Sequence, residues 1–207
     1  MRKLVVSMNI TLDGFISGPH CELDWHFKHW TSKMAEALAR QLSRADTIVL
    51  GRVTYCAMAK FWMSKSGDPG LPREDLAFAD MMNRYRKIVF TKTIHEASWN
   101  NAEVINGSLQ KEITLLKKQL GRDMIVYGSN KLVSSLIRFN LVDEYTLWVH
   151  PVFLGKGKPL FNGAGKLAMN LLNTETFPSG VIKMDLRPAS LNVAENGELV
   201  WAPRVVG

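Results

Sequence analysis

Apolar positions follow two alternating periods along the first two thirds of the chain. Short runs of strand-forming residues alternate with segments in which apolar residues recur three or four positions apart. The predicted strands are 4–10, 47–50, 87–90, 103–105 and 124–127, and the predicted helices are 32–44, 52–62, 74–85, 108–120 and 131–139. Strands that alternate with helices in this way indicate a mostly parallel sheet with helices on both of its faces.

The helix expected at 108–120 shows how the element boundaries are predicted. Ser108 has the hydroxyl of an N-cap, and a glycine follows the last helical residue. Leu109, Ile113, Leu116 and Leu120 recur at helical spacing. We expect these four leucine and isoleucine side chains to form one buried stripe.

The pattern changes in the last third of the chain. A strand that begins at Glu144 is ended by Pro151, and strands at 169–175 and 181–186 are separated by a proline and a glycine. Such a reversal predicts antiparallel strands at one edge of the sheet. We therefore expect one domain over residues 1–187, followed at 188–207 by a tail or an extra edge strand.

Composition narrows the class of protein. The chain has 207 residues, of which 46% are hydrophobic and 22% are charged, so it is long enough to bury a core. It has no apolar run of membrane-spanning length, and its first residues do not resemble a signal peptide. Its two cysteines suggest no disulfide framework. We expect a cytoplasmic protein that does not bind a membrane.

The formal net charge of +7 raises the question of an anionic partner. The basic residues are scattered, and no recognition helix, zinc finger or RNA-binding motif accompanies them. We therefore expect no nucleic-acid partner. An anionic small molecule fits the charge equally well.

Small and polar residues follow three of the predicted strands, where ligands bind in open parallel sheets. In VLGRVTY, Gly51 allows close backbone approach, Arg52 is a bidentate phosphate partner and Thr54 adds a hydroxyl. In VFTKT, Thr91 and Lys92 place a hydroxyl and a cation just past a strand, and a second threonine follows. The third turn, YGSNKL, leaves backbone N–H groups and the positive end of a helix dipole facing outward.

Each turn also has a purely structural interpretation. Gly51 can simply close a strand, Arg52 can pair with a carboxylate, and Lys92 can be solvated. Taken together, three such ends on one sheet edge suit a dinucleotide, and the cation with its hydroxyls suits the 2′-phosphate of NADP. Neither G-x-G-x-x-G after the first strand nor G-x-x-x-x-G-K-[ST] is present, so the common Rossmann and P-loop motifs are excluded.

Polar residues at the end of the first strand are candidates for the substrate side. Asp13 and Gly14 follow this strand, and we expect Asn9 on the same edge. A carboxylate in a dry pocket, with a raised pKa, can relay the proton that a hydride acceptor needs, which makes Asp13 the candidate catalytic residue. The alternative is a tight turn in which Asp13 caps the backbone.

The stretch HCELDWHFKHW has two interpretations. We favour a loop that lines the substrate pocket, with Trp25 as a contact residue. The alternative is a zinc or copper site made by His20, Cys21, His26 and His29. Because C-x-x-C and H-E-x-x-H are both absent, we expect no metal.

Five ordered segments carry a resemblance to a known family. ITLDGFIS, VLGRVTY, KIVFTKT, DMIVYGSNKLVSSLIRFNLVDEY and HPVFLGKGKPLF resemble dihydrofolate-reductase-like proteins related to the C-terminal reductase domain of the bacterial bifunctional riboflavin deaminase-reductase. The resemblance spans the chain to about residue 187. It implies a three-layer α/β/α fold, NADPH as hydride donor and a homodimer.

The resemblance also implies which residues bind the cofactor. By position, the family's cofactor-binding turns correspond to Gly51, Arg52, Thr54, Thr91, Lys92, Gly128, Ser129, Asn130 and Leu132. Asn9, Asp13, Gly14 and Trp25 are the candidates for contact with a small-molecule substrate. The implied activity is NADPH-dependent reduction of a small carbonyl or imine of riboflavin or pterin metabolism. The alternative is a nucleotide-binding module that has lost hydride chemistry.

Three departures from the family pattern affect the choice of substrate. Ser129 stands where many relatives have a second glycine, which changes the contact with a diphosphate. Phe15 stands where riboflavin-pathway members commonly have a basic residue, which argues against a phosphoribosyl substrate. The deaminase signature H-x-E with P-C-x-x-C is absent, so the chain shows no sign of the deaminase step.

Overall fold

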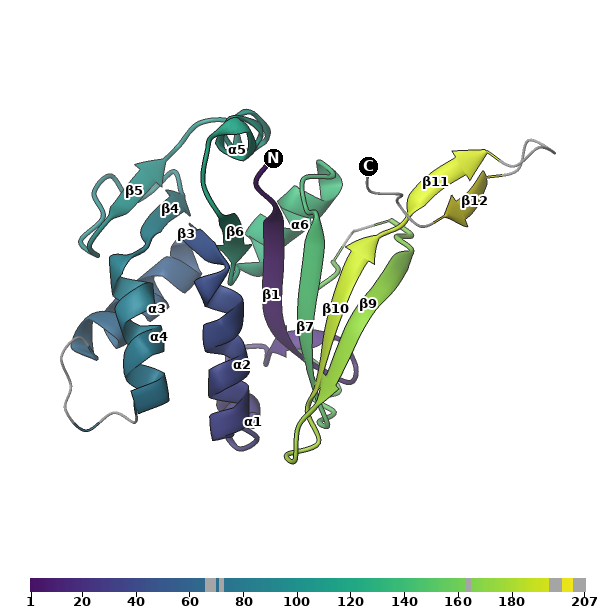
Figure 1. The fold of residues 1–207 in the computed structure, drawn as a ribbon, viewed down its shortest axis with the longest axis horizontal. Coiled ribbons are helices and arrows are strands. Elements are labelled where there is room, and N and C mark those ends of the chain that lie inside the picture. Colours follow the sequence, from purple (N-terminus) through teal and green to yellow (C-terminus); the bar gives the residue numbers. More distant parts are fainter. Residues whose placement is uncertain (66–69, 71–72, 163–164, 194–198, 203–207) are drawn as a thin grey trace.

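An eight-stranded sheet forms the centre of the computed structural model, which describes residues 1–65, 70, 73–162, 165–193 and 199–202 (Figure 1). Its strands are β1 (Leu4–Thr11), β3 (Ala45–Gly51), β4 (Arg86–Phe90), β5 (Ala102–Ile105), β6 (Asp123–Val126), β7 (Glu144–His150), β9 (Met169–Thr176) and β10 (Ile182–Pro188). Their order across the sheet is β5-β4-β3-β6-β1-β7-β10-β9. Neighbours from β5 to β7 are parallel, whereas β10 and β9 are antiparallel additions. The predicted sheet is confirmed.

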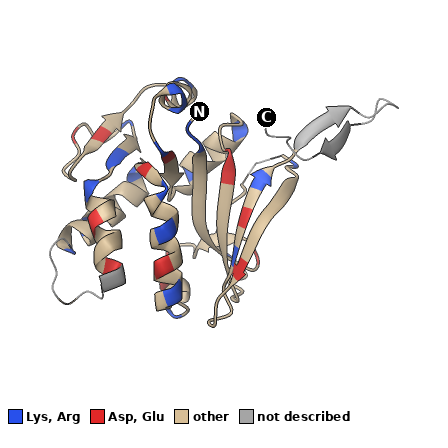
Figure 2. Ribbon diagram, in the orientation of Figure 1, with Lys and Arg blue, Asp and Glu red and all other residues tan. Residues whose placement is uncertain are grey.

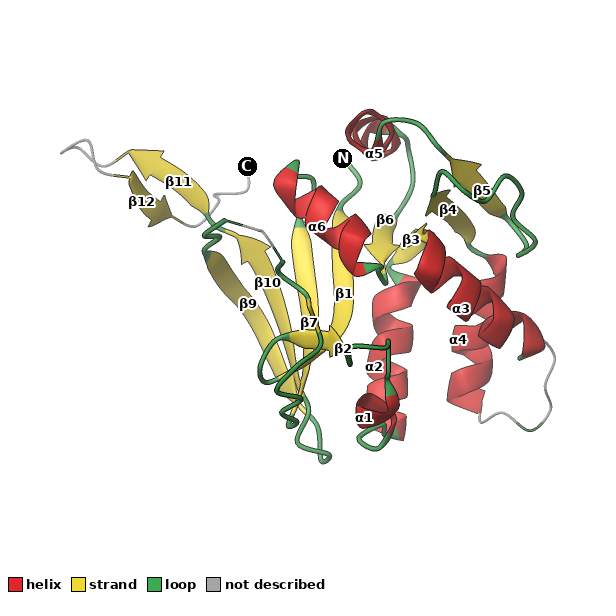
Figure 3. Cartoon of the chain, turned by 180° about the vertical axis from the view of Figure 1, so that it is seen from behind, coloured by secondary structure: helices red, strands yellow, loops and turns green. Residues whose placement is uncertain are grey.

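Helices cover both faces of this sheet. They are α1 (Asp24–Phe27), α2 (Ser32–Ser43), α3 (Arg52–Ser64), α4 (Arg73–Arg84), α5 (Leu109–Lys118) and α6 (Asn130–Arg138). Figure 3 shows α6 in front of the central strands when the molecule is seen from behind. Within the described part of the chain, no helix is long and apolar enough to cross a membrane.

Successive residues of β3 show how the core divides into two layers. Val49 packs in a cluster with residues of α5 and α6, whereas Ile48 and Leu50 pack in a second cluster with residues of α2, α3 and α4. All three side chains are fully buried. Burying one such side chain stabilises the fold by about 1.5–3 kcal/mol. The predicted three-layer α/β/α architecture is therefore confirmed.

The carboxyl end of α5 differs from the prediction. Ser108 is the N-cap, as expected, because its hydroxyl accepts a hydrogen bond from Lys111 N. The helix ends at Lys118, however, because Gln119 adopts an extended conformation. Leu120 consequently leaves the buried stripe and is 100% exposed. The prediction that Leu120 belongs to the core was wrong.

Two smaller sheets complete the described structure. β2 (Phe15–Ser17) pairs with β8 (Lys158–Pro159), a contact that the sequence pattern did not predict. β11 (Ser190–Val193) pairs with β12 (Leu199–Ala202) in a hairpin of its own. Pro188 ends β10, and neither β11 nor β12 extends the eight-stranded sheet.

Charges of both signs are interspersed over the described surface, as Figure 2 shows for α2 and β10. On α2, Arg40 lies 3.7 Å from Glu36 one turn earlier and 3.5 Å from Glu175 of β9. Exposed pairs of this kind contribute little to stability, about 0–1 kcal/mol each.

Candidate functional site

Three strand ends meet at one edge of the sheet. Parallel pairing sets Gly51 opposite Phe90, and Thr91 follows directly. Gly51 N donates a hydrogen bond of 3.0 Å to Gly128 O, which joins the turn after β3 to the turn after β6. We call the set made by Gly51–Thr54, Thr91, Lys92 and Gly128–Leu132 the rim.

Two glycines allow the turns of the rim to touch. A Cβ atom on Gly51 would lie 2.5 Å from Ser129 Oγ and 3.1 Å from Ser129 N. Gly128 has φ +120°, and a Cβ atom on it would lie 3.0 Å from Thr54 Oγ1. The peptide bond between Gly128 and Ser129 is cis. Side chains at either glycine would fill the space where the two backbones meet.

The rim also brings together the N-termini of two helices. α3 follows Gly51 and α6 follows Ser129, and neither N-cap residue makes a side-chain hydrogen bond to its helix. In contrast, Thr31 caps α2 and Ser108 caps α5. The first N–H groups of α3 and α6 have no partner within their own helices, and both dipoles place partial positive charge here. This arrangement is suited to a phosphate or diphosphate.

Basic side chains follow two of the three strands that form the rim, β3 and β4. Arg52, the first residue of α3, is exposed, and so is Lys92. No carboxylate within the described residues forms an ion pair with either side chain. The hydroxyl of Thr91 accepts hydrogen bonds from the backbone N–H groups of Thr93 and Ile94, so it stabilises the turn.

Two predicted cofactor residues are occupied by structural contacts. The side-chain amide of Asn130 donates a hydrogen bond to Pro159 O in β8. The side chain of Leu132 is only 6% exposed and packs in the core cluster under α6. Leu132 can therefore face a ligand at the rim only through its backbone N–H.

Asp13 is held by hydrogen bonds from a distant segment. Its carboxylate accepts hydrogen bonds from Thr11 Oγ1 (2.5 Å), Leu154 N (3.2 Å) and Gly155 N (2.8 Å). Burial acts to raise the pKa of Asp13, but the bonds from Thr11, Gly155 and Leu154 together lower it below its ordinary value. The predicted raised pKa was wrong, because these donors stabilise the charged form.

Gly14 adopts the tight turn that the sequence left open. Its φ of +82° lies in the left-handed region, which favours glycine. Gly14 N donates to Thr11 O at 2.9 Å, and Gly14 O accepts from Leu160 N at 3.0 Å. Both polar backbone groups of Gly14 are thus used inside the protein.

Asn9 and Trp25 meet at a residue that the sequence analysis missed. Asn9 Oδ1 lies 3.0 Å from Nε2 of His150, and the ring of Trp25 lies edge-on to that imidazole with centroids 5.1 Å apart. His150 is fully buried, and this burial lowers its pKa to about 4, assisted by repulsion from His26 and His29. The feature that could have identified His150 from the sequence is its position at the carboxyl end of β7, which runs parallel to β1.

The candidate metal ligands do not form a cluster in the described part of the chain. No group of three or more histidine, cysteine, aspartate or glutamate side chains there is arranged to hold a metal ion. The thiol of Cys21 accepts a contact from Lys158 Nζ, and the N–H of His20 donates to the carboxylate of Glu22.

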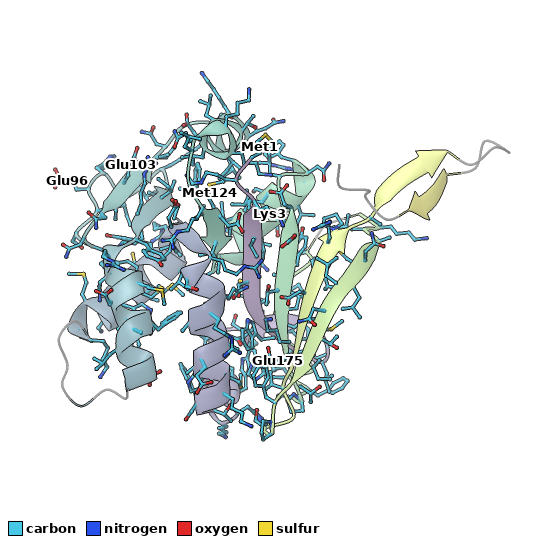
Figure 4. The ribbon with its side chains drawn as sticks, in the orientation of Figure 1. Met1, Lys3, Glu96, Glu103, Met124 and Glu175 are labelled. Carbon is cyan, nitrogen blue, oxygen red and sulfur yellow. The ribbon has the colours of Figure 1, made fainter. Side chains whose placement is uncertain are left out.

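A cavity of about 590 Å³ runs along one face of the sheet, between α2 and the strands. It is lined by residues at the start of β1, β6 and β7, together with α2, β9 and β10; Figure 4 labels Lys3, Met124 and Glu175 among its lining residues. Its charges are paired internally, for example Lys3 with Glu144 at 2.8 Å. None of the rim residues lines this cavity, so it does not belong to the candidate site.

Comparison with known proteins agrees with the fold. YyaP of Bacillus subtilis, named only as an uncharacterized protein, is 34% identical over 184 residues, which is 88% of this chain and 93% of YyaP. A putative riboflavin biosynthesis protein from Shewanella sp. PV-4 has a TM-score of 0.68 at 20% identity, covering 91% of this chain and 99% of its own.

The fold also resembles that of a dihydrofolate reductase. The enzyme from Enterococcus faecalis, solved with NADP(H), has a TM-score of 0.57 at 15% identity over 90% of this chain and 96% of its own. The family model described as RibD C-terminal domain matches residues 2–183. The chain therefore belongs to the RibD C-terminal domain family.

Proposed function

We propose that the chain is an NADPH-dependent reductase that transfers a hydride to a small carbonyl or imine acceptor. The observation that carries the proposal is the hydrogen bond between Gly51 and Gly128, which joins two uncapped helix N-termini at one rim. A structural neighbour from Thermotoga maritima is named a deaminase and 5-amino-6-(5-phosphoribosylamino)uracil reductase, so an aminouracil-type or pterin-type acceptor is the first choice. Phe15 argues against a phosphoribosyl group on that acceptor.

The residues present at the rim fit NADPH. Glycine at positions 51 and 128 lets the two turns pack closely, so the N–H groups that begin α3 and α6 lie near each other, an arrangement that suits a diphosphate. Arg52 and Lys92 supply the positive charge that a 2′-phosphate requires. When bound, NADPH supplies the hydride, and the surrounding chain holds it in place.

The role of Asp13 in the proposal follows from its hydrogen bonds. Reduction of C=O or C=N also requires a proton, but the lowered pKa keeps Asp13 ionised at neutral pH. We therefore give Asp13 a positioning role, in which it fixes the turn after β1. The proton then comes from water.

Selectivity between the two nicotinamide cofactors tests the proposal. Arg52→Ala combined with Lys92→Ala removes charge-assisted contacts, so NADPH should bind about ten- to a hundredfold more weakly while NADH changes little. Tryptophan fluorescence quenching gives both dissociation constants. Lys118→Ala, which removes an exposed lysine of α5, is the matched control. Equal affinity of the intact protein for NADH and NADPH would contradict the role of Lys92.

The fully hydrogen-bonded carboxylate of Asp13 favours one alternative, a nucleotide-binding module without hydride chemistry. The two functions are separated by following the absorbance of reduced nicotinamide with a panel of cyclic carbonyl and imine acceptors. Tight NADPH binding with no oxidation in any case would favour the module.

We extend the proposal to a cytoplasmic homodimer. On the edge strand β9, Leu171 is 55% exposed and Leu172 is 45% exposed, and an edge strand can pair with a second copy. Sedimentation analysis of the full chain measures the oligomeric state directly.

A further inference from the structure

Two adjacent aromatic rings each carry a buried nitrogen atom without a hydrogen-bond partner. Neither Trp25 Nε1 nor His150 Nδ1 has a partner among the residues that the structure describes. Trp25 is 6% exposed and His150 is 0% exposed. Buried polar atoms are nearly always hydrogen-bonded, so two neighbouring exceptions indicate groups that a ligand satisfies.

The contact with Asn9 determines whether His150 Nδ1 donates or accepts a hydrogen bond with such a ligand. Asn9 Oδ1 only accepts hydrogen bonds, so Nε2 of a neutral imidazole must carry the proton. The other ring nitrogen, Nδ1, is then an acceptor. Its lowered pKa, about 4, keeps His150 neutral at physiological pH, because burial and the nearby His26 and His29 disfavour the charged form. Trp25 Nε1 can only donate.

The two rings lie at the same edge of the sheet as the rim. His150 ends β7 and Asn9 lies near the end of β1, and β1 runs parallel both to β7 and to β6, which leads into the turn at Gly128. A Cβ atom on Gly128 would lie 3.7 Å from Met8 Cε, so β1 borders that turn. Met8 and Asn9 point to opposite faces of the sheet, so the unpartnered nitrogens lie across β1 from this contact.

We infer that Trp25 and His150 recognise a neutral amide or lactam edge of the acceptor, whose N–H donates to His150 Nδ1 while its carbonyl accepts from Trp25 Nε1. This inference rests on the proposed function, because it takes the neighbouring rim to be the cofactor site. It assigns specificity to two side chains that transfer neither hydride nor proton. Asn9 acts through His150 as a positioning residue, since it fixes the tautomer.

A pair of probes that differ by methylation of the two ring nitrogens tests the inference. Uracil has lactam edges, whereas 1,3-dimethyluracil keeps both carbonyls but has no N–H. The full chain is titrated with each, with and without NADPH, while the indole N–H signals are followed by ¹H–¹⁵N NMR. The signal that disappears in Trp25→Phe identifies Trp25. We expect uracil to shift this signal and to bind at least about tenfold more tightly than dimethyluracil, because the latter leaves a buried acceptor unpaired.

Two variants show whether His150 is the origin of the preference. His150→Phe keeps a planar ring but removes the acceptor, so the ratio of the two affinities should fall to about one. His20→Phe changes an exposed histidine of the same segment and should keep the ratio.

Opposing results identify which idea fails. Equal affinity of the intact protein for the two probes, or an unmoved Trp25 signal up to millimolar uracil, would overturn the inference. If NADPH still quenches tryptophan fluorescence in that sample, the proposed function survives. If NADPH does not bind but the preference for uracil is present, the reductase proposal fails, whereas Trp25 and His150 remain assigned to the recognition of a lactam edge.

Discussion

The rim and the turn after β1 are built by opposite means. The rim consists of backbone groups in three strand–turn–helix or strand–turn segments, and glycine at two positions lets the backbones meet. The turn after β1 is held by the side chain of Asp13, which bonds to backbone groups 141 and 142 positions later. Local sequence specifies each separate turn of the rim, whereas the contacts of the Asp13 side chain exist only once distant segments have folded together. A change at the rim should therefore affect ligand binding, and a change at Asp13 should affect local order.

The largest effect is expected from Gly51→Ala. The added methyl would meet Ser129 Oγ at 2.5 Å and Ser129 N at 3.1 Å, so the two turns must separate. Overpacking of this kind costs about 1–3 kcal/mol, and NADPH affinity should fall about ten- to a hundredfold. Urea unfolding and fluorescence quenching measure the two losses.

Two further variants separate a specific clash from a general effect of alanine. Gly165→Ala adds its methyl where nothing lies within 4 Å, so it should leave NADPH binding unchanged. Ser129→Gly removes the hydroxyl that the methyl meets and should restore part of the affinity lost in Gly51→Ala. Wild-type affinity in Gly51→Ala itself would show that the backbones of the rim do not hold the cofactor.

A smaller and local effect is expected from Asp13→Ala. The substitution leaves the N–H groups of Leu154 and Gly155 without their acceptor. Their amide hydrogen exchange should accelerate about tenfold, which corresponds to the loss of about one net hydrogen bond. Exchange at Gly51 N, which bonds to Gly128 O, is the internal reference and should not change. Faster exchange at both sites would mean that the two regions are not independent.

The smallest effect is expected in the dependence of the unfolding free energy on pH. Because the pKa of Asp13 is lower in the folded chain than its ordinary value of 3.8, its charged form stabilises the fold above pH 3.8. That contribution is lost as the pH falls through the lowered pKa. The difference in unfolding free energy between the intact chain and Asp13→Asn should thus be constant from about pH 5 to 7 and shrink below pH 3.8. A difference that grows in acid would show that Asp13 is not stabilised as a carboxylate.

The same contrast explains how much the sequence predicted. Apolar periodicity located every strand of the large sheet, and the glycine and hydroxyl residues after β3, β4 and β6 located the rim. Neither signal reports contacts between distant segments. The pairing of β2 with β8, the donors around Asp13 and the burial of His150 therefore had to come from the structure.

Leu132 and Leu120 show that a local sequence pattern does not always predict the environment of a single side chain. Leu132 belongs by position to a predicted cofactor-binding turn, yet its side chain is in the core. Leu120 has the spacing of a core residue, yet one extended residue before it turns it to solvent. In both cases backbone direction decides the role of the side chain.

The hydrogen bond from Asn130 to Pro159 links the rim to the turn after β1. Asn130 begins the helix whose first turn faces the rim, and Pro159 pairs with the short strand that follows Asp13. A contact that orders the first turn of α6 therefore also orders β8 and its partner β2 through this hydrogen bond. Under the proposed function, such a linkage favours an ordered mechanism in which NADPH binds first and the acceptor then binds beside a β2–β8 pair that is already ordered.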